Sequence, residues 1–146
     1  MRTRELFGAA LIACTVTSAN AQDFAAVSVR WTEAFVAGDL AKSMTLYDPN
    51  ATFVGLGSRQ VGPDREAARK YLSGVFTSTS KREVTCDSPI VRQRGDVTVV
   101  ASICQFSIAF KDGRKLDNPV RYHMVVQKDG SNLLITDHHL SLVPGK

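Results

Sequence analysis

The sequence predicts an α+β domain in which helices cover one face of an antiparallel sheet. Apolar residues recur at three- and four-residue steps between residues 23 and 76, which is the period of amphipathic helices. From Arg82 onward, strand-like segments follow one another with only short turns between them. Helices gathered at the N-terminal end and consecutive hairpins after them are typical of this fold class.

The first predicted helix spans residues 23–37, and Gly38 ends it. Asp39 can cap a second, shorter helix that runs to about Tyr47. Residues 48–50 form a turn before a short strand at 51–54, and Gly62-Pro63-Asp64 opens a third helix. The residues predicted to face the core are Phe24, Val27, Trp31, Ala34, Phe35, Leu40, Met44, Tyr47, Ala68, Leu72, Val75 and Phe76.

Four strands are predicted at residues 82–93, 97–110, 120–128 and 131–143. In the second of them, alternate residues share a face, and both faces carry apolar side chains. One face holds Val100, Cys104, Phe106, Ile108 and Phe110, and the other holds Ala101, Ile103, Gln105 and Ser107. A small domain cannot cover both faces by itself, so we expect a second copy of the chain to cover one of them, as a homodimer or a larger ring.

The last two strands form a hairpin whose predicted turn is Asp129-Gly130. This turn would place His123 opposite Thr136 and Arg121 opposite His138, all on one side of the ribbon. A guanidinium and two imidazoles beside a hydroxyl group predict a site for a small anion, such as a carboxylate.

Residues 1–21 have the pattern of a signal peptide. Arg2 and Arg4 precede the apolar segment 6–17, which is too short to span a bilayer, and residues 19–21 (Ala-Asn-Ala) supply a small-x-small cleavage site. We therefore expect one exported domain over residues 22–146, periplasmic or secreted. An alternative is a lipoprotein anchored through Cys14, because residues 11–14 (Leu-Ile-Ala-Cys) resemble a bacterial lipobox.

Cys86 and Cys104 are placed symmetrically about Gly95, so a hairpin that turns there puts them opposite each other. Directly opposed Cα atoms lie about 4.5 to 5.5 Å apart, which suits a disulfide. Export to an oxidising compartment favours this bond, and the alternative is a pair of reduced, buried cysteines.

Charge and composition exclude some classes of partner. Cleavage removes two arginines and one glutamate, which lowers the formal charge from +4 to +3, and the cations are scattered along the chain. We therefore expect neither a nucleic-acid partner nor, beyond the cleaved signal, a membrane. No cofactor is predicted. No metal site is predicted either, because neighbouring histidines on a strand point to opposite faces.

Two motifs carry a family resemblance. They are the Trp-x-x-Ala-Phe-x-x-Gly-Asp helix at residues 31–39 and the segment Tyr-Asp-Pro-Asn-Ala-Thr-Phe at residues 47–53. Together with Arg121, Lys128-Asp-Gly130 and Asp137-His-His-x-Ser141, they resemble the nuclear-transport-factor-2-like (SnoaL-like) superfamily. Within it, the chain is most similar to the association domain of calcium/calmodulin-dependent protein kinase II and its stand-alone bacterial relatives.

This resemblance implies a cone-shaped fold in which a curved sheet wraps a long helix and encloses a pocket. Residues 58–62 depart from the family's Leu-Arg-Thr-Thr-like segment, so that only Arg59 matches a pocket position. Leu140 interrupts the pair of serines that often follows the histidines. The chain has no kinase motifs.

The residues favour a binding or assembly domain over an enzyme. Ligand contacts are predicted from Arg121, His138, His123, Tyr47 and Arg59, with Arg121 and His138 as the anion-binding floor. Structural roles, such as an ion pair for Arg121, are the alternative. A small pocket enzyme of the isomerase, dehydratase or hydrolase type is the second hypothesis. In that case Tyr47 would supply a hydroxyl group, but no carboxylate in an apolar setting accompanies it.

Overall fold

The computed structural model describes residues 20–145 and has an α+β fold. The helices are α1 (Ala21–Ala37), α2 (Leu40–Met44) and α3 (Arg65–Ser78). The strands are β1 (Tyr47–Val54), β2 (Thr79–Cys86), β3 (Ile90–Arg94), β4 (Val97–Phe110), β5 (Lys115–Asp129) and β6 (Asn132–Leu142). The predicted lipobox cysteine, Cys14, and the predicted signal peptide lie outside the described residues, except for Asn20, which caps α1, and Ala21, its first residue.

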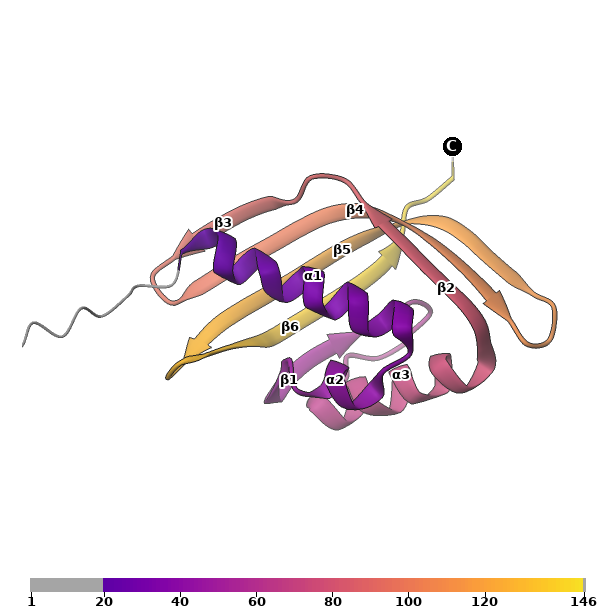
Figure 1. Ribbon diagram of the computed structural model, residues 1–146, viewed down its shortest axis with the longest axis horizontal. Helices are drawn as coiled ribbons and strands as arrows, with labels where there is room; N and C mark the ends of the chain where they lie inside the picture. Colours follow the sequence, from indigo (N-terminus) through magenta and orange to yellow (C-terminus); the bar gives the residue numbers. More distant parts are fainter. Residues whose placement is uncertain (1–19, 146) are drawn as a thin grey trace, which may run out of the picture.

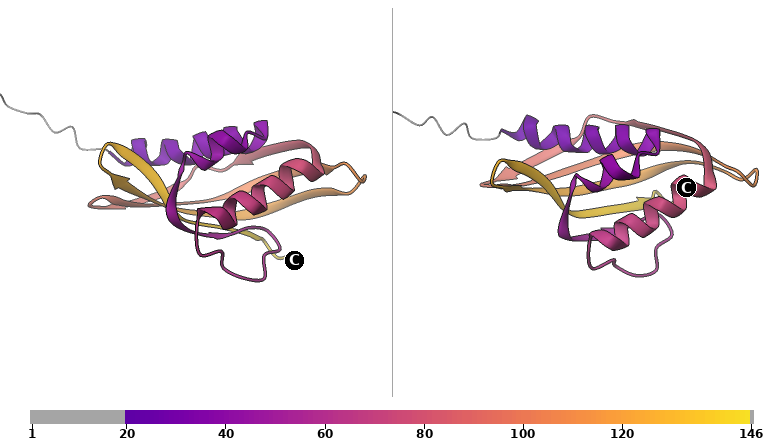
Figure 2. Two further views of the ribbon diagram at one scale, coloured as in Figure 1. Left: turned by 90° about the horizontal axis from the view of Figure 1, so that it is seen from below. Right: turned by 60° about the horizontal axis from the view of Figure 1, so that its bottom comes forward.

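The sheet is curved, and α1 lies across one of its faces (Figures 1 and 2). Its strand order is β1-β6-β5-β4-β2, with β3 also paired to β4. All the hairpin pairs are antiparallel, as predicted, but β1 pairs with β6 in parallel, so the sheet is mixed. Figure 1 shows α2 and α3 beside the β1 edge, which leaves α1 to cover the middle strands.

Local signals set the helix ends. The Asn20 side chain accepts hydrogen bonds from the first turn of α1, and Asp23 completes a capping box. Gly38 ends α1 in the left-handed conformation (φ 71°), which costs glycine little. Asp39 caps α2, as predicted, and Asp64 caps α3 at the predicted helix start, because each carboxylate accepts a backbone N–H of the first turn.

Two predicted elements end elsewhere in the structure. The second helix stops at Met44, so Tyr47 begins β1 and does not lie on a helix. The predicted strand 82–93 is two strands, β2 and β3, joined by residues 87–89. Pro89 has no N–H to offer a strand ladder, which suits a break at that point.

The β5–β6 register differs from the predicted one. The loop residues are Gly130 and Ser131, because Asp129 pairs with Asn132. Among the described residues only glycines have positive φ, so Asp129 remains in the strand and the turn moves by one residue. That move shifts the pairing by two residues, and a bulge between Val125 and Val126 adds a third.

An odd shift exchanges the two faces of β6 relative to β5. Arg121 pairs with Ser141, and His138 pairs with Met124. The predicted pairing of Arg121 with His138 is therefore wrong. His138 lies in the core, whereas Arg121 lies on the outer face, exposed to solvent.

The Cys86–Cys104 disulfide is present and joins the end of β2 to β4, with a Cα–Cα distance of 3.9 Å. The two cysteines are direct partners, as predicted, but in the β2–β4 ladder, because the hairpin that turns at Gly95 joins β3 to β4 in a register one residue different. Cys104 is completely buried and Cys86 is exposed. The bond therefore anchors the edge of the sheet to the core, which consists of the inner sheet face, α1 and α3.

Candidate functional site

A chain of three hydrogen-bonded side chains lies in the core beneath α1. The Trp31 indole N–H, from α1, donates to the hydroxyl oxygen of Tyr47 on β1 over 2.8 Å. That hydroxyl lies 2.7 Å from Nδ1 of His138 on β6. All three side chains are at most 1% exposed, so the parallel β1–β6 pairing and the packing of α1 bring together residues distant in sequence.

Burial determines the protonation states of His138 and Tyr47. Removal from water lowers the pKa of His138 to about 3, with the charges of His123 and His139 as smaller causes, so His138 is neutral at pH 7. Burial also raises the pKa of Tyr47, which keeps its proton. Because Trp31 already donates to the Tyr47 oxygen, we assign the Tyr47 proton to the bond with Nδ1, which leaves the imidazole proton on Nε2.

Aromatic rings surround the His138 imidazole. The rings of Trp31, Phe53 and Tyr122 lie edge-on to it, with centroid distances of 4.6, 5.6 and 5.1 Å. Its Nε2 atom is buried and has no hydrogen-bond partner among the described residues. This environment holds a neutral imidazole in one orientation and disfavours its charged form.

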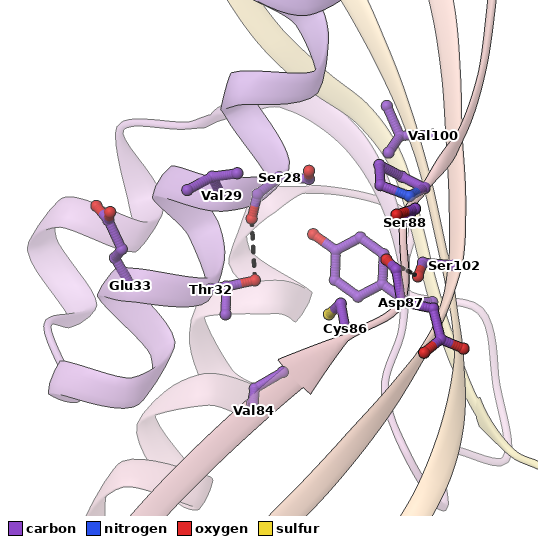
Figure 3. Close-up of a pocket in the computed structure, with 12 residues that line it drawn as sticks. Ser28, Val29, Thr32, Glu33, Val84, Cys86, Asp87, Ser88, Val100 and Ser102 are labelled. Atoms are coloured by element: carbon purple, nitrogen blue, oxygen red, sulfur yellow. Dashed lines mark hydrogen bonds between the residues drawn. The ribbon is translucent and has the colours of Figure 1, made fainter.

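A first pocket of about 350 Å³, the α1-side pocket, opens between α1 and the strands next to the disulfide (Figure 3). Hydroxyl groups and small apolar groups share its lining. The lining residues are Ser28, Val29, Thr32, Glu33, Val84, Cys86, Asp87, Ser88, Pro89, Val100, Ser102 and Tyr122. Three of the hydroxyl groups already donate to backbone carbonyl groups, namely those of Ser28, Thr32 and Ser102.

The two carboxylates of the α1-side pocket belong to exposed residues. Figure 3 shows Glu33 extending from the side of α1 opposite Ser28, away from the other lining residues. Asp87 is also exposed, on the segment between β2 and β3. Burial raises the pKa of the Tyr122 hydroxyl well above its usual range. The pocket therefore lacks a desolvated carboxylate that could serve as a general base.

A second pocket of about 530 Å³, the α3-side pocket, lies between α3, the β1–α3 loop and the ends of the sheet strands. Its lining is mainly apolar. The lining residues are Phe35, Leu56, Gly57, Tyr71, Val75, Phe106, Ile108, Phe110, Arg114, Lys115, Leu116, Leu140 and Leu142. Two of these residues carry a charge, and both charges are positive.

The structure brings together two of the five predicted ligand-binding residues, Tyr47 and His138. Arg121 donates to the Leu142 carbonyl oxygen over 3.1 Å, and His123 lies on the same outer face, 3.8 Å from the Asp137 carboxylate. Arg59 lies exposed in the β1–α3 loop. None of these five lines the α1-side or the α3-side pocket.

Sequence reasoning missed the polar role of Trp31 and the charged edge of the α3-side pocket. In the sequence, Trp31 is one member of an apolar stripe. Only the tertiary structure shows that its indole N–H donates a hydrogen bond to Tyr47. Arg114 and Lys115 follow the turn at Asp112-Gly113 and look like ordinary turn cations. Their position could be found only once the β4–β5 hairpin was placed against α3.

Residues 20–145 contain neither a helix that could span a membrane nor a cluster of metal-ligating side chains. No described helix is long and apolar enough to cross a membrane. In the same range, no three histidine, cysteine, aspartate or glutamate side chains gather in a way that could hold a metal ion.

Comparison with known proteins agrees with this fold. A Xanthomonas campestris protein named as a calcium/calmodulin-dependent protein kinase II association domain is 28% identical, with a TM-score of 0.76 over 90% of this chain and 93% of that chain. A nuclear transport factor 2-like protein from Salmonella enterica is 20% identical (TM-score 0.76; 86% and 92% covered). A Streptomyces avermitilis protein named as a dehydratase of the same family is 16% identical (TM-score 0.75; 85% and 96% covered).

Among curated proteins, none is significantly similar in sequence. The model of the SnoaL-like domain family matches residues 24–145, which is nearly the whole described chain. The predicted superfamily and its α+β fold are thus confirmed. The chain belongs to the SnoaL-like domain family.

Proposed function

We propose that this protein is a small-molecule-binding domain, and that it binds an anionic ligand in the α3-side pocket. One observation carries the proposal: this mainly apolar pocket of about 530 Å³ has Arg114 and Lys115 as its charged lining residues and no carboxylate or imidazole. Its size lies within the range of roughly 300–1,000 Å³ of small-molecule sites. In this proposal the positive charges near the anion belong to Arg114 and Lys115, and not to Arg121 as predicted.

The same lining argues against acid–base catalysis in this pocket. An isomerase or dehydratase of the proton-transfer kind needs a base within reach of the substrate, held in an environment that tunes its pKa. Tyr71 lines the pocket, but burial raises its pKa and its hydroxyl group donates to the Leu56 carbonyl oxygen. Similarity to proteins named as dehydratases supports the fold, and the pocket chemistry favours binding.

The proposal includes self-association through the outer face of the sheet. Val99 pairs with Val125 there, and Ala101 and Ile103 continue the same row of β4. Ile103 is 41% exposed, so this apolar row is open to solvent in the single chain. A second copy would remove it from water, at roughly 25 cal/mol per Å² of apolar surface.

Export is the third part of the proposal. A disulfide between Cys86 and Cys104 supports it, because such bonds form and persist in oxidising compartments. Periplasmic or secreted localisation also agrees with the sequence of residues 1–21.

The test of anion binding is calorimetric titration of the purified protein with hexanoate and with 1-hexanol. We expect hexanoate to bind more tightly. Lys115→Met, which keeps the apolar stem and removes the charge, should weaken hexanoate binding about tenfold. The matched control is Lys111→Met in the same turn, outside the pocket lining. Equal binding of hexanoate and hexanol, or no loss in Lys115→Met, would overturn the proposal.

A further inference from the structure

The two cations of the α3-side pocket are not equivalent. The Arg114 Nε atom lies 2.8 Å from the Asp112 carboxylate, and its guanidinium lies over the Phe110 ring, 4.7 Å from the ring centroid. The hydrogen bonds from Arg114 hold the pKa of Asp112 below its usual value, so this carboxylate is ionised at pH 7. The charge of Arg114 is therefore already compensated by a neighbour.

Lys115 has no ion-pair partner among the described residues. It stands at the start of β5, paired with Ala109 of β4, so the ladder fixes its backbone at the pocket edge. Its exposed side chain is free to reach a ligand at the mouth. The pocket thus offers one uncompensated positive charge, and that charge lies at its edge.

The inner part of the pocket is apolar. Phe35, Phe106 and Leu140 are each at most 3% exposed and belong to the core behind it. Val75 of α3 and Leu116 of β5 are half-buried and pack against that core. A second charged group pushed into this region would lose its hydration without gaining a partner, which is costly.

From this distribution we infer that the ligand of the α3-side pocket is an amphipathic monoanion, with one carboxylate at Lys115 and an apolar body among the inner residues. The inference rests on the proposed function and adds the chemical class of the ligand. A dianion is disfavoured because Arg114 is engaged by Asp112. A short hydrophilic anion is disfavoured because it would leave the apolar wall in contact with water.

The experiment is calorimetric titration with butanoate, hexanoate and octanoate, and with the dianion hexanedioate. Each methylene buried in an apolar site contributes up to about fourfold in affinity. We expect octanoate to bind at least about tenfold more tightly than butanoate, and hexanedioate to bind more weakly than hexanoate. Val75→Phe, which fills the inner space from the α3 side, should reduce octanoate binding far more than butanoate binding.

The outcomes separate the two claims. Equal affinities for butanoate and octanoate, or tighter binding of hexanedioate than hexanoate, would overturn the amphipathic monoanion and leave anion binding intact. Unchanged octanoate binding in a folded Val75→Phe variant would also overturn it. If no carboxylate of any length binds, the proposed function and this inference fail together.

Discussion

The protein should become less stable as the pH falls from 7 to 5, because His138 takes up a proton in the unfolded chain but not in the folded one. The imidazole is completely buried, and its burial lowers the pKa to about 3, whereas the ordinary value is 6.5. Below pH 6.5 the unfolded chain binds a proton at this residue, and the folded chain does not until the pH approaches 3. Stability from this group is therefore complete above pH 6.5 and is lost progressively as the pH falls towards 3.

The magnitude follows from the difference between the two pKa values. Each unit is worth about 1.4 kcal/mol, so the loss is about 2 kcal/mol at pH 5 and would approach 5 kcal/mol below pH 3. A domain of this size has a stability of roughly 5–15 kcal/mol, so a loss of that size is readily measured. His123 and His139 lie on the outer face and are not buried.

The assay is urea unfolding at pH 7 and pH 5, followed by circular dichroism. His138→Asn keeps an acceptor near the Nδ1 position and removes the titrating group. That variant should be less stable at pH 7 and should lose much less stability at pH 5 than the parent protein. His123→Asn is the matched control, because it removes a histidine from the opposite face of the sheet, and it should keep most of the parental pH dependence, since burial is the larger cause of the lowered His138 pKa.

Two results would refute this reasoning. Unfolding free energies that agree at pH 7 and pH 5 in the parent protein would show that His138 is not held neutral by burial. A parental pH dependence that persists in His138→Asn and disappears in His123→Asn would assign the effect to the outer face.

Three further predictions concern the disulfide, the buried hydrogen bonds of Tyr47 and the outer face of the sheet. Unreduced protein unfolded in urea should have no free thiol at Cys86, and Cys86→Ser should cost about 3 kcal/mol of stability in urea unfolding; two titratable thiols in residues 22–146 would contradict this. Tyr47→Phe leaves two buried hydrogen-bond partners unsatisfied and should cost roughly 2–4 kcal/mol of stability in the same assay. Tyr71→Phe loses one partly buried hydrogen bond and should cost about 1 kcal/mol. Equal costs would argue against the hydrogen bonds that join Trp31, Tyr47 and His138. Light scattering should give a dimer or larger assembly that Ile103→Lys dissociates and Val29→Lys, on α1, does not; a single-subunit mass for the parent protein would count against it.

Local sequence patterns by themselves determined most of the elements of this protein. The amphipathic stripe and Gly38 fixed the end of α1, and Asp39 and Asp64 marked the helix starts because a cap is satisfied within one turn. Alternation gave the inner face of β4, and the symmetry of Cys86 and Cys104 about Gly95 indicated the cysteine pair, although the pair lies in the β2–β4 ladder beyond the break at residues 87–89. Each of these signals acts over a few residues or through one tight hairpin.

The tertiary structure alone decided which residues meet in the core and at the pockets. Whether His138 shares a face with Arg121 or with Tyr122 depended on the bulge between Val125 and Val126, which leaves no strong signal in the sequence. The contact of Trp31 with Tyr47 and His138 requires α1, β1 and β6 to pack together, since local periodicity shows only that each residue is buried. Burial of His138, and the lowered pKa that follows from it, are therefore properties of the assembled core.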